Sequence, residues 1–197
     1  MARRALLQWI VQTHKPNLVC IHQNGSTESY EWVIEDLKPL INVHWIHTPE
    51  TLRQHDWYLK PLEWLLDQGC GAFFWADHDD IFYTNHVAAC LRELDFCDFT
   101  VSDQCGVLRV KDLDYRYAKP VKFTSHAPGG MSSSMAFNRN FAESLKEDLR
   151  EDKKYHYADN VVAFITKLKH SKYISNRQTT AYVSHLGANS SSSWIDF

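Results

Sequence analysis

The hydrophobic pattern of the first hundred residues switches repeatedly between two periods. Apolar side chains at helical spacing predict helices, and short β-rich or alternating runs predict strands. On this basis we expect helices at residues 5–13, 30–40, 51–69 and 85–94, and strands at 17–22, 41–47, 72–76 and 98–103. Strands that alternate with helices predict βαβ crossovers, and therefore an α/β fold with a mostly parallel sheet covered on both faces.

Some of these elements carry a more specific expectation. Residues 5–11 are also compatible with a strand. The helix at 51–69 is expected to begin at a Thr48 or Thr51 cap and to end at Gly69, and Pro61 predicts a break or kink inside it. The buried face of the helix at 30–40 is expected to hold Trp32, Val33, Leu37 and Leu40.

The second half of the chain is less regular. Residues 104–128 have weak periodicity and mixed charge, and a segment of this kind is functional or mobile. A strand is expected within 129–139, with Met131, Ser133, Met135 and Phe137 on one face, and helices are expected at 140–149 and 158–170. The 197 residues fit a single domain, divided into a first half (1–103), a mobile loop (104–128) and a second half (129–197).

Composition narrows the class of protein. The net charge of −3 provides no basic field for nucleic acid. The five cysteines are scattered without a CxxC pair, which is typical of reduced residues in an intracellular protein. No apolar segment is long enough to span a bilayer, so we expect a cytoplasmic protein without a transmembrane segment.

A group of carboxylates follows the aromatic strand expected at 72–76. Asp77 and Asp79 are separated by one residue, and Asp80 comes next. Two carboxylates at this spacing can both reach one hard cation such as Mn²⁺ or Mg²⁺. Ligands bind beyond the carboxyl ends of strands in α/β sheets, so the position favours a functional site. The alternative is a solvated acidic turn.

Other candidates each have a simpler explanation as well. His185 has the chemistry of a further metal ligand, but the chain has eleven histidines. Asp159 precedes an apolar helix, where it would serve as a helix cap or as a general base. The segment 24–26 (Asn24, Gly25 and Ser26) is a turn whose amides could hold a ligand. The side chains of Arg53 and Lys60 would either bind phosphates or face solvent without a role.

The order of these motifs resembles that of GT-A-type glycosyltransferases, closest to the family-2-like group. "QNGSTES" (23–29) is similar to the family's D-N-G-S-T-D turn, and "FFWADHDD" (73–80) resembles its D-x-D motif at a strand end. "GGMSSSMAFNRNF" looks like the acceptor-side strand ending in Arg139, "YADNVVAFITKL" resembles the E-D motif, and "SHLGANSSSSW" is similar to the C-terminal metal-binding histidine. The compact size is also similar to that of small glycosyltransferase-like proteins of archaeal viruses.

The resemblance implies a single-domain, Rossmann-like GT-A fold and a metal-dependent transfer of sugar. The donor would be a nucleotide-diphosphate sugar, the acceptor a hydroxyl of a glycan or glycoprotein, and the outcome inversion. Asp79 would bind Mn²⁺ or Mg²⁺, Asp77 would bind the ribose or the metal, and His185 would complete the site. Asp80 would support these ligands. Asp159 would be the catalytic base.

Two departures from the family pattern keep other functions open. Gln23 replaces the acidic residue of the nucleotide turn, and Ala158 replaces the Glu of E-D. There is almost no room for the family's first strand before Arg3, unless residues 5–11 form it. The alternatives are a metal-dependent phosphoesterase, and a non-catalytic viral or structural protein that retains the transferase fold.

Overall fold

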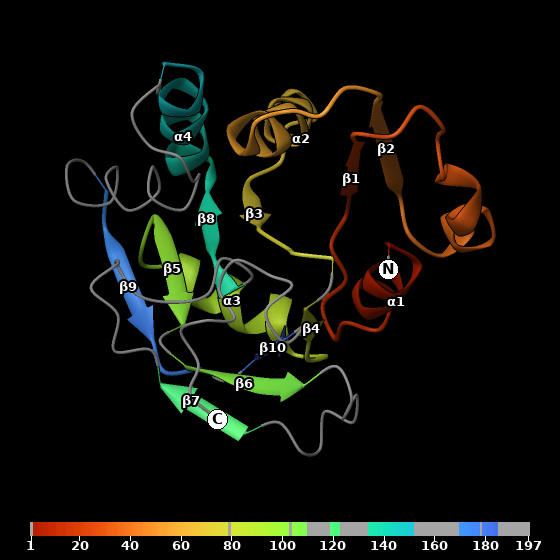
Figure 1. Ribbon diagram of the computed structural model, residues 1–197. Helices are drawn as coiled ribbons and strands as arrows, with labels where there is room; N and C mark the ends of the chain where they lie inside the picture. Colours follow the sequence, from red (N-terminus) through yellow and green to blue (C-terminus); the bar gives the residue numbers. More distant parts are fainter. Residues whose placement is uncertain are drawn as a thin grey trace.

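The computed structural model describes residues 2–78, 80–102, 104–109, 119–122, 134–151, 170–177 and 179–184 (Figure 1). The helices are α1 (Ala2–Ile10), the 3-10 helix η1 (Glu31–Leu40), α2 (Gln54–Asp67), α3 (His86–Leu94) and α4 (Arg139–Glu151). The strands are β1 (Val19–Asn24), β2 (Val43–Thr48), β3 (Ala72–Phe74), β4 (Ile81–Phe82), β5 (Phe99–Ser102), β6 (Gln104–Arg109), β7 (Lys119–Lys122), β8 (Ala136–Asn138), β9 (Lys172–Ser175) and β10 (Thr180–Ser184). Among the described helices, none is long and apolar enough to cross a membrane.

The described strands form three sheets, with orders β1-β2, β3-β8-β5-β9 and β4-β10-β6-β7. The pairs β1–β2, β5–β9 and β6–β10 are parallel, whereas β3–β8, β5–β8, β4–β10 and β6–β7 are antiparallel. The α/β class is confirmed, but the strand directions are mixed where a mostly parallel sheet was expected. β8 enters between β3 and β5 in the opposite direction, and in the third sheet β4 and β7 run opposite to their neighbours β10 and β6.

The apolar side chains divide into two buried clusters. One cluster joins α2 and α4 to the sheet containing β3, β5 and β8, and its largest fully buried members are Phe99 and Phe141. The other joins α1, η1, β4 and the start of α3. β3 contributes to both, since Phe73 lies in the first cluster while Phe74 packs against the second. This division follows from the alternation of side chains along a strand.

Residues 5–10 belong to α1, so the alternative of a strand at 5–11 is wrong. The helix buries Leu6 and Trp9, which are three residues apart, as expected for one helical face. The predicted buried face of 30–40 is confirmed for Leu37 and wrong for Trp32 and Leu40. The 3-10 helix η1 buries Ile34 and Leu37, while Trp32 is 70% exposed. A 3-10 helix has three residues per turn, so its buried row follows a spacing of three.

Pro61 does not break α2. A proline cannot donate to the carbonyl four residues earlier, which here belongs to Trp57. The imidazole Nδ1 of His22 lies 3.0 Å from that carbonyl oxygen and donates to it from β1. α2 therefore continues to Asp67 with this carbonyl satisfied.

The ends of α2 agree only partly with the prediction. Gly69 follows the helix with a φ of +77°, as expected for a terminating glycine. The helix begins after Arg53, which makes no side-chain capping bond, so neither Thr48 nor Thr51 is the cap.

The segment 104–128, expected to be a mobile loop, includes regular structure. Residues 104–109 form β6 and residues 119–122 form β7, and these two strands pair with each other. β6 also pairs with β10 from the end of the described chain. The rest of 104–128, Met131, Ser133 and most of the helix expected at 158–170 lie outside the described residues.

Candidate functional site

The turn after β1 lies against the end of β2. The amide nitrogen of Gly25 donates to the carbonyl oxygens of Thr48 and Glu50, both at 3.1 Å. Gly25 has a φ of +76°, and a Cβ at this position would lie 3.2 Å from Thr51 Oγ1. Backbone conformation and close approach therefore both favour glycine. His47 fixes the same turn from β2, with its Nε2 atom 2.7 Å from the carbonyl oxygen of Ser26.

A polar cluster joins the ends of β1 and β2 to α2. The pKa of the His22 imidazole lies below its ordinary value, chiefly because the ring is partly buried. The hydrogen bond to the Trp57 carbonyl raises the pKa, and the charge of Lys60 lowers it further. His22 is then neutral at pH 7, and because Nδ1 carries the proton, Nε2 accepts a hydrogen bond from Thr48 Oγ1 at 3.0 Å. Thr48 Oγ1 in turn accepts from Lys60 Nζ at 3.1 Å. These contacts fix the lysine at the strand ends.

The same turn of α2 also contacts the residue that follows β3. The hydroxyl of Tyr58 lies 3.2 Å from Asp77 Oδ1, and its ring packs edge-on against Trp75 with the centroids 3.9 Å apart. Residues 57–60 of α2 thus contact His22, Thr48 and Asp77. In Figure 1, α2 lies between β3 and the β1–β2 pair. α2 therefore contacts both Thr48 at the end of β2 and Asp77 after β3.

Only some of the other predicted site residues belong to the part of the chain that the structure describes. Arg53 is 64% exposed and bonds Asp56 at 3.1 Å on the first turn of α2. Asp80 is buried, and its backbone oxygen accepts from Gln8 Nε2 at 3.1 Å. Asp79, Asp159 and His185 lie outside the described residues. Arg139 begins α4 and donates to the backbone oxygens of Leu66 and Cys70, which gives it a structural role.

The described residues supply one of the expected metal ligands. The carboxylate of Asp77 is half-buried at the site edge and has the oxygen donors that Mn²⁺ and Mg²⁺ prefer. Among the residues that the structure describes, no group of three or more potential ligands is found. The donor set fits a divalent cation only together with Asp79 and His185.

Sequence reasoning missed the residues that hold this edge together. His22 and His47 had been given no role, and Thr48 had been considered only as a cap. Each lies in the last residues of β1 or β2, where the edge rule for α/β sheets applies. Tyr58 had no signal of its own, because nothing in its local sequence indicates a contact nineteen residues away.

A second titratable cluster is buried around α3. Cys90 Sγ lies 3.8 Å from His86 Nε2, and both side chains are fully buried. Burial raises the pKa of the Cys90 thiol to about 12 and, with the charge of Arg177, lowers the pKa of His86 to about 3. His86 Nδ1 lies 2.9 Å from Thr179 Oγ1. A buried neutral thiol beside a neutral imidazole is inert, so this pair is structural.

The depressed pKa of His86 predicts acid sensitivity. Below pH 6.5 the unfolded chain binds a proton that the folded chain refuses, so stability present above pH 6.5 is lost as the pH falls towards 3. At pH 5 the loss from this group is about 2 kcal/mol. Between pH 7.5 and 5, the free energy of unfolding of the wild type should therefore fall by about 2 kcal/mol more than that of His86→Phe, as measured by urea unfolding. The exposed His14, changed to Gln, is the control, and equal pH dependence in all three proteins would contradict the assignment.

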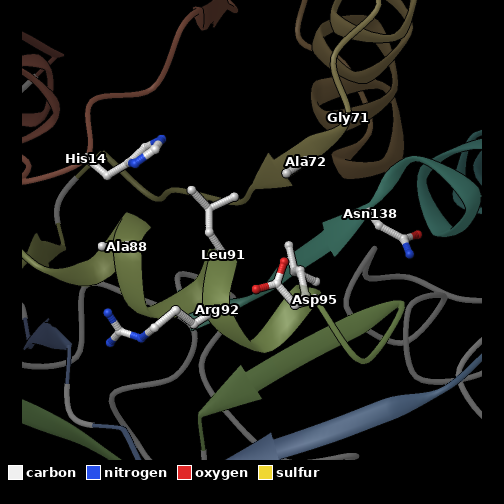
Figure 2. A pocket seen from close by; sticks show the side chains of 9 residues that line it. His14, Gly71, Ala72, Ala88, Leu91, Arg92, Asp95 and Asn138 are labelled. Carbon is white, nitrogen blue, oxygen red and sulfur yellow. The ribbon is translucent and has the colours of Figure 1, made fainter.

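A shallow hollow of about 570 Å³ lies at the other end of β3. Gly71 and Ala72 line it at the start of the strand, whereas Asp77 follows the strand's end. Figure 2 shows the polar ends of His14, Arg92 and Asp95 spread around the hollow. The amide of Asn138, also in the lining, is already used by Asp98 and the Phe141 nitrogen. The hollow is separate from the candidate site and has no converging polar groups.

No family model and no curated protein matches the sequence. Solved structures do match the fold. S. aureus TarS 1-349 in complex with UDP has a TM-score of 0.62 and 10% identity over 92% of this chain and 56% of that chain. A longer S. aureus TarS chain has a TM-score of 0.56 and 13% identity over 91% and 33% of the two chains.

HddC from Yersinia pseudotuberculosis has a TM-score of 0.50 and 13% identity, over 90% of this chain and 74% of that chain. This chain spans little more than half of TarS 1-349, so it matches a part of that protein. At such low identities the likeness concerns the fold. The chain has an α/β fold of the GT-A type, which it shares with TarS and HddC.

Proposed function

We propose that the protein is a glycosyltransferase that moves a sugar from a nucleotide-diphosphate donor to an acceptor hydroxyl. The observation that carries the proposal is that one turn of α2 contacts both Asp77 and Thr48, and that the backbone oxygen of Thr48 accepts from the Gly25 amide. This arrangement belongs to a fold shared with TarS, whose solved complex holds UDP. A donor nucleotide would lie along this edge, with its base at the turn and its diphosphate towards Asp77.

Two cations on α2 would offset the charge of the diphosphate. Lys60 is held by Thr48 and still has N–H groups for a phosphate oxygen. Arg53 bonds Asp56 at an exposed position, where an ion pair contributes little to stability. Its guanidinium can therefore turn to a bound phosphate at little cost.

Asp77, with Asp79 and His185, would hold Mn²⁺ or Mg²⁺. When bound, the cation would neutralise charge on the leaving diphosphate. Asp77 would also orient the ribose, since Tyr58 fixes one of its oxygens. Asp159 would take the proton from the acceptor hydroxyl of a glycan or glycoprotein, and attack opposite the leaving group would invert the anomeric carbon.

A thermal-shift panel of nucleoside diphosphates, each with and without Mn²⁺, tests the donor site. A ligand at 100 times its Kd stabilises the native state by about 2.7 kcal/mol. For a chain of this size that corresponds to a rise in Tm of roughly 5–10 °C. We expect one diphosphate to give this shift only with the metal, and its monophosphate to give much less. If no nucleotide shifts the Tm under any metal condition, the non-catalytic alternative replaces the transferase.

A further inference from the structure

The side chain of Gln23 closes the loop between β1 and η1 on itself. Its Nε2 atom donates to the carbonyl oxygen of Glu28 at 2.6 Å, and its Oε1 atom accepts from the amide nitrogen of Tyr30 at 2.9 Å. One carboxamide therefore joins the end of the strand to the residues just before the 3-10 helix. Both the donor and the acceptor of the amide are used.

The rest of the loop is held by shorter bonds. Ser26 Oγ donates to the carbonyl oxygen of Glu28 at 3.1 Å and accepts from its amide at 3.3 Å. His47 and the Gly25 amide attach the loop to β2 and the residues after it. None of these bonds reaches Tyr30. Ser29 Oγ accepts from the Glu31 amide at 3.4 Å, and Gln23 adds a shorter link from the end of β1 to the residue before η1.

The neighbouring carboxamide is available to a ligand. Within the part of the chain that the structure describes, the side chain of Asn24 makes no hydrogen bond, and it is only half-buried. Asn24 is paired in register with Thr48, so it lies at the edge where the site residues meet. An amide offers both a donor and an acceptor to the edge of a nucleotide base.

We propose that Gln23 is a positioning residue that holds the loop 24–30 in its binding conformation, and that Asn24 and the loop amides contact the nucleotide base. The inference rests on the proposed donor site. It also explains why a glutamine stands where the similar family motif has an acidic residue. A carboxylate has no N–H to donate to the Glu28 oxygen, so an acid at position 23 would open one end of the clamp. A loop held closed before binding avoids the entropy cost of ordering it.

The near-isosteric variant Gln23→Glu tests the clamp. We expect amide hydrogen exchange across residues 24–30, measured by mass spectrometry without ligand, to rise about tenfold. Affinity for the nucleoside diphosphate identified by the thermal-shift panel should also fall about tenfold, by calorimetry, as one hydrogen bond is lost and its acceptor faces a carboxylate. Global stability in urea should change little, because the loop is exposed.

Two further variants separate positioning from contact. Asn24→Ala should lower nucleotide affinity about tenfold while leaving loop exchange unchanged. Gln68→Glu makes the same charge change at an exposed glutamine on the end of α2 and should alter neither measurement. If Gln23→Glu leaves loop exchange at the wild-type rate, the clamp is wrong, whatever happens to binding. If the loop loosens but no nucleotide binds the wild type, the clamp stands and both the donor site and the base contact of Asn24 fall.

Discussion

Replacing Asp77 with Ala is expected to lower the affinity for a nucleoside diphosphate and Mn²⁺ by at least about 100-fold, or about 2.7 kcal/mol. The carboxylate is the one expected metal or ribose ligand that the structure places, half-buried beside α2. An alanine removes both its charge and its oxygens. Calorimetry with and without Mn²⁺ measures the loss, and Asp79→Ala should abolish the metal dependence in the same assay.

Tyr58→Phe is the matched control for this change. It removes the hydroxyl that lies 3.2 Å from Asp77 Oδ1 but keeps the carboxylate and most of the ring packing on Trp75. Supporting groups of a metal site contribute about 10–100-fold to affinity, so an intermediate loss is expected. Wild-type affinity in Asp77→Ala, with an unchanged urea transition, would remove Asp77 from the site.

The order of elements could be predicted from the sequence because local periodicity decides it. The strand expected at 72–76 illustrates this, since Ala72–Phe74 form β3. Strand direction could not be predicted, because β8 would read the same locally whether it joined its neighbours parallel or antiparallel. The buried face of η1 was mispredicted because a helical spacing was assumed for a 3-10 helix.

The candidate site shows the same limit. Gly25 and Asp77 could be proposed from the sequence because turn chemistry and strand-end charge are local signals. Residues that act across the chain were not found. His22 satisfies a carbonyl that Pro61 leaves open 35 residues away, and that contact is absent from any local pattern. For the same reason the sequence predicts a break or kink at Pro61, and α2 continues without a break.

A buried ion pair, which no local sequence pattern indicates, joins Glu93 near the end of α3 to Arg177 just after β9. The side chains of Arg177 and Glu93 are 7% and 14% exposed. The guanidinium donates to Glu93, to Thr100 Oγ1 at 2.7 Å and to the backbone oxygen of Ser134, and Ser175 Oγ donates to Glu93 at 2.6 Å. The pair therefore ties α3, β5, β9 and the segment before β8 together.

Arg177→Met is expected to destabilise the protein by about 3–5 kcal/mol, because it leaves the Glu93 carboxylate buried without its partner. Urea unfolding measures the change, and Tm should fall by roughly 10 °C. The double variant Arg177→Met with Glu93→Leu should recover most of the loss, since no unpaired charge remains. Arg150→Met breaks the exposed pair with Glu63, whose side chains are 48% and 34% exposed, and should change the urea midpoint little. Equal losses in the two single variants would mean that burial of the Arg177 pair does not matter to the fold.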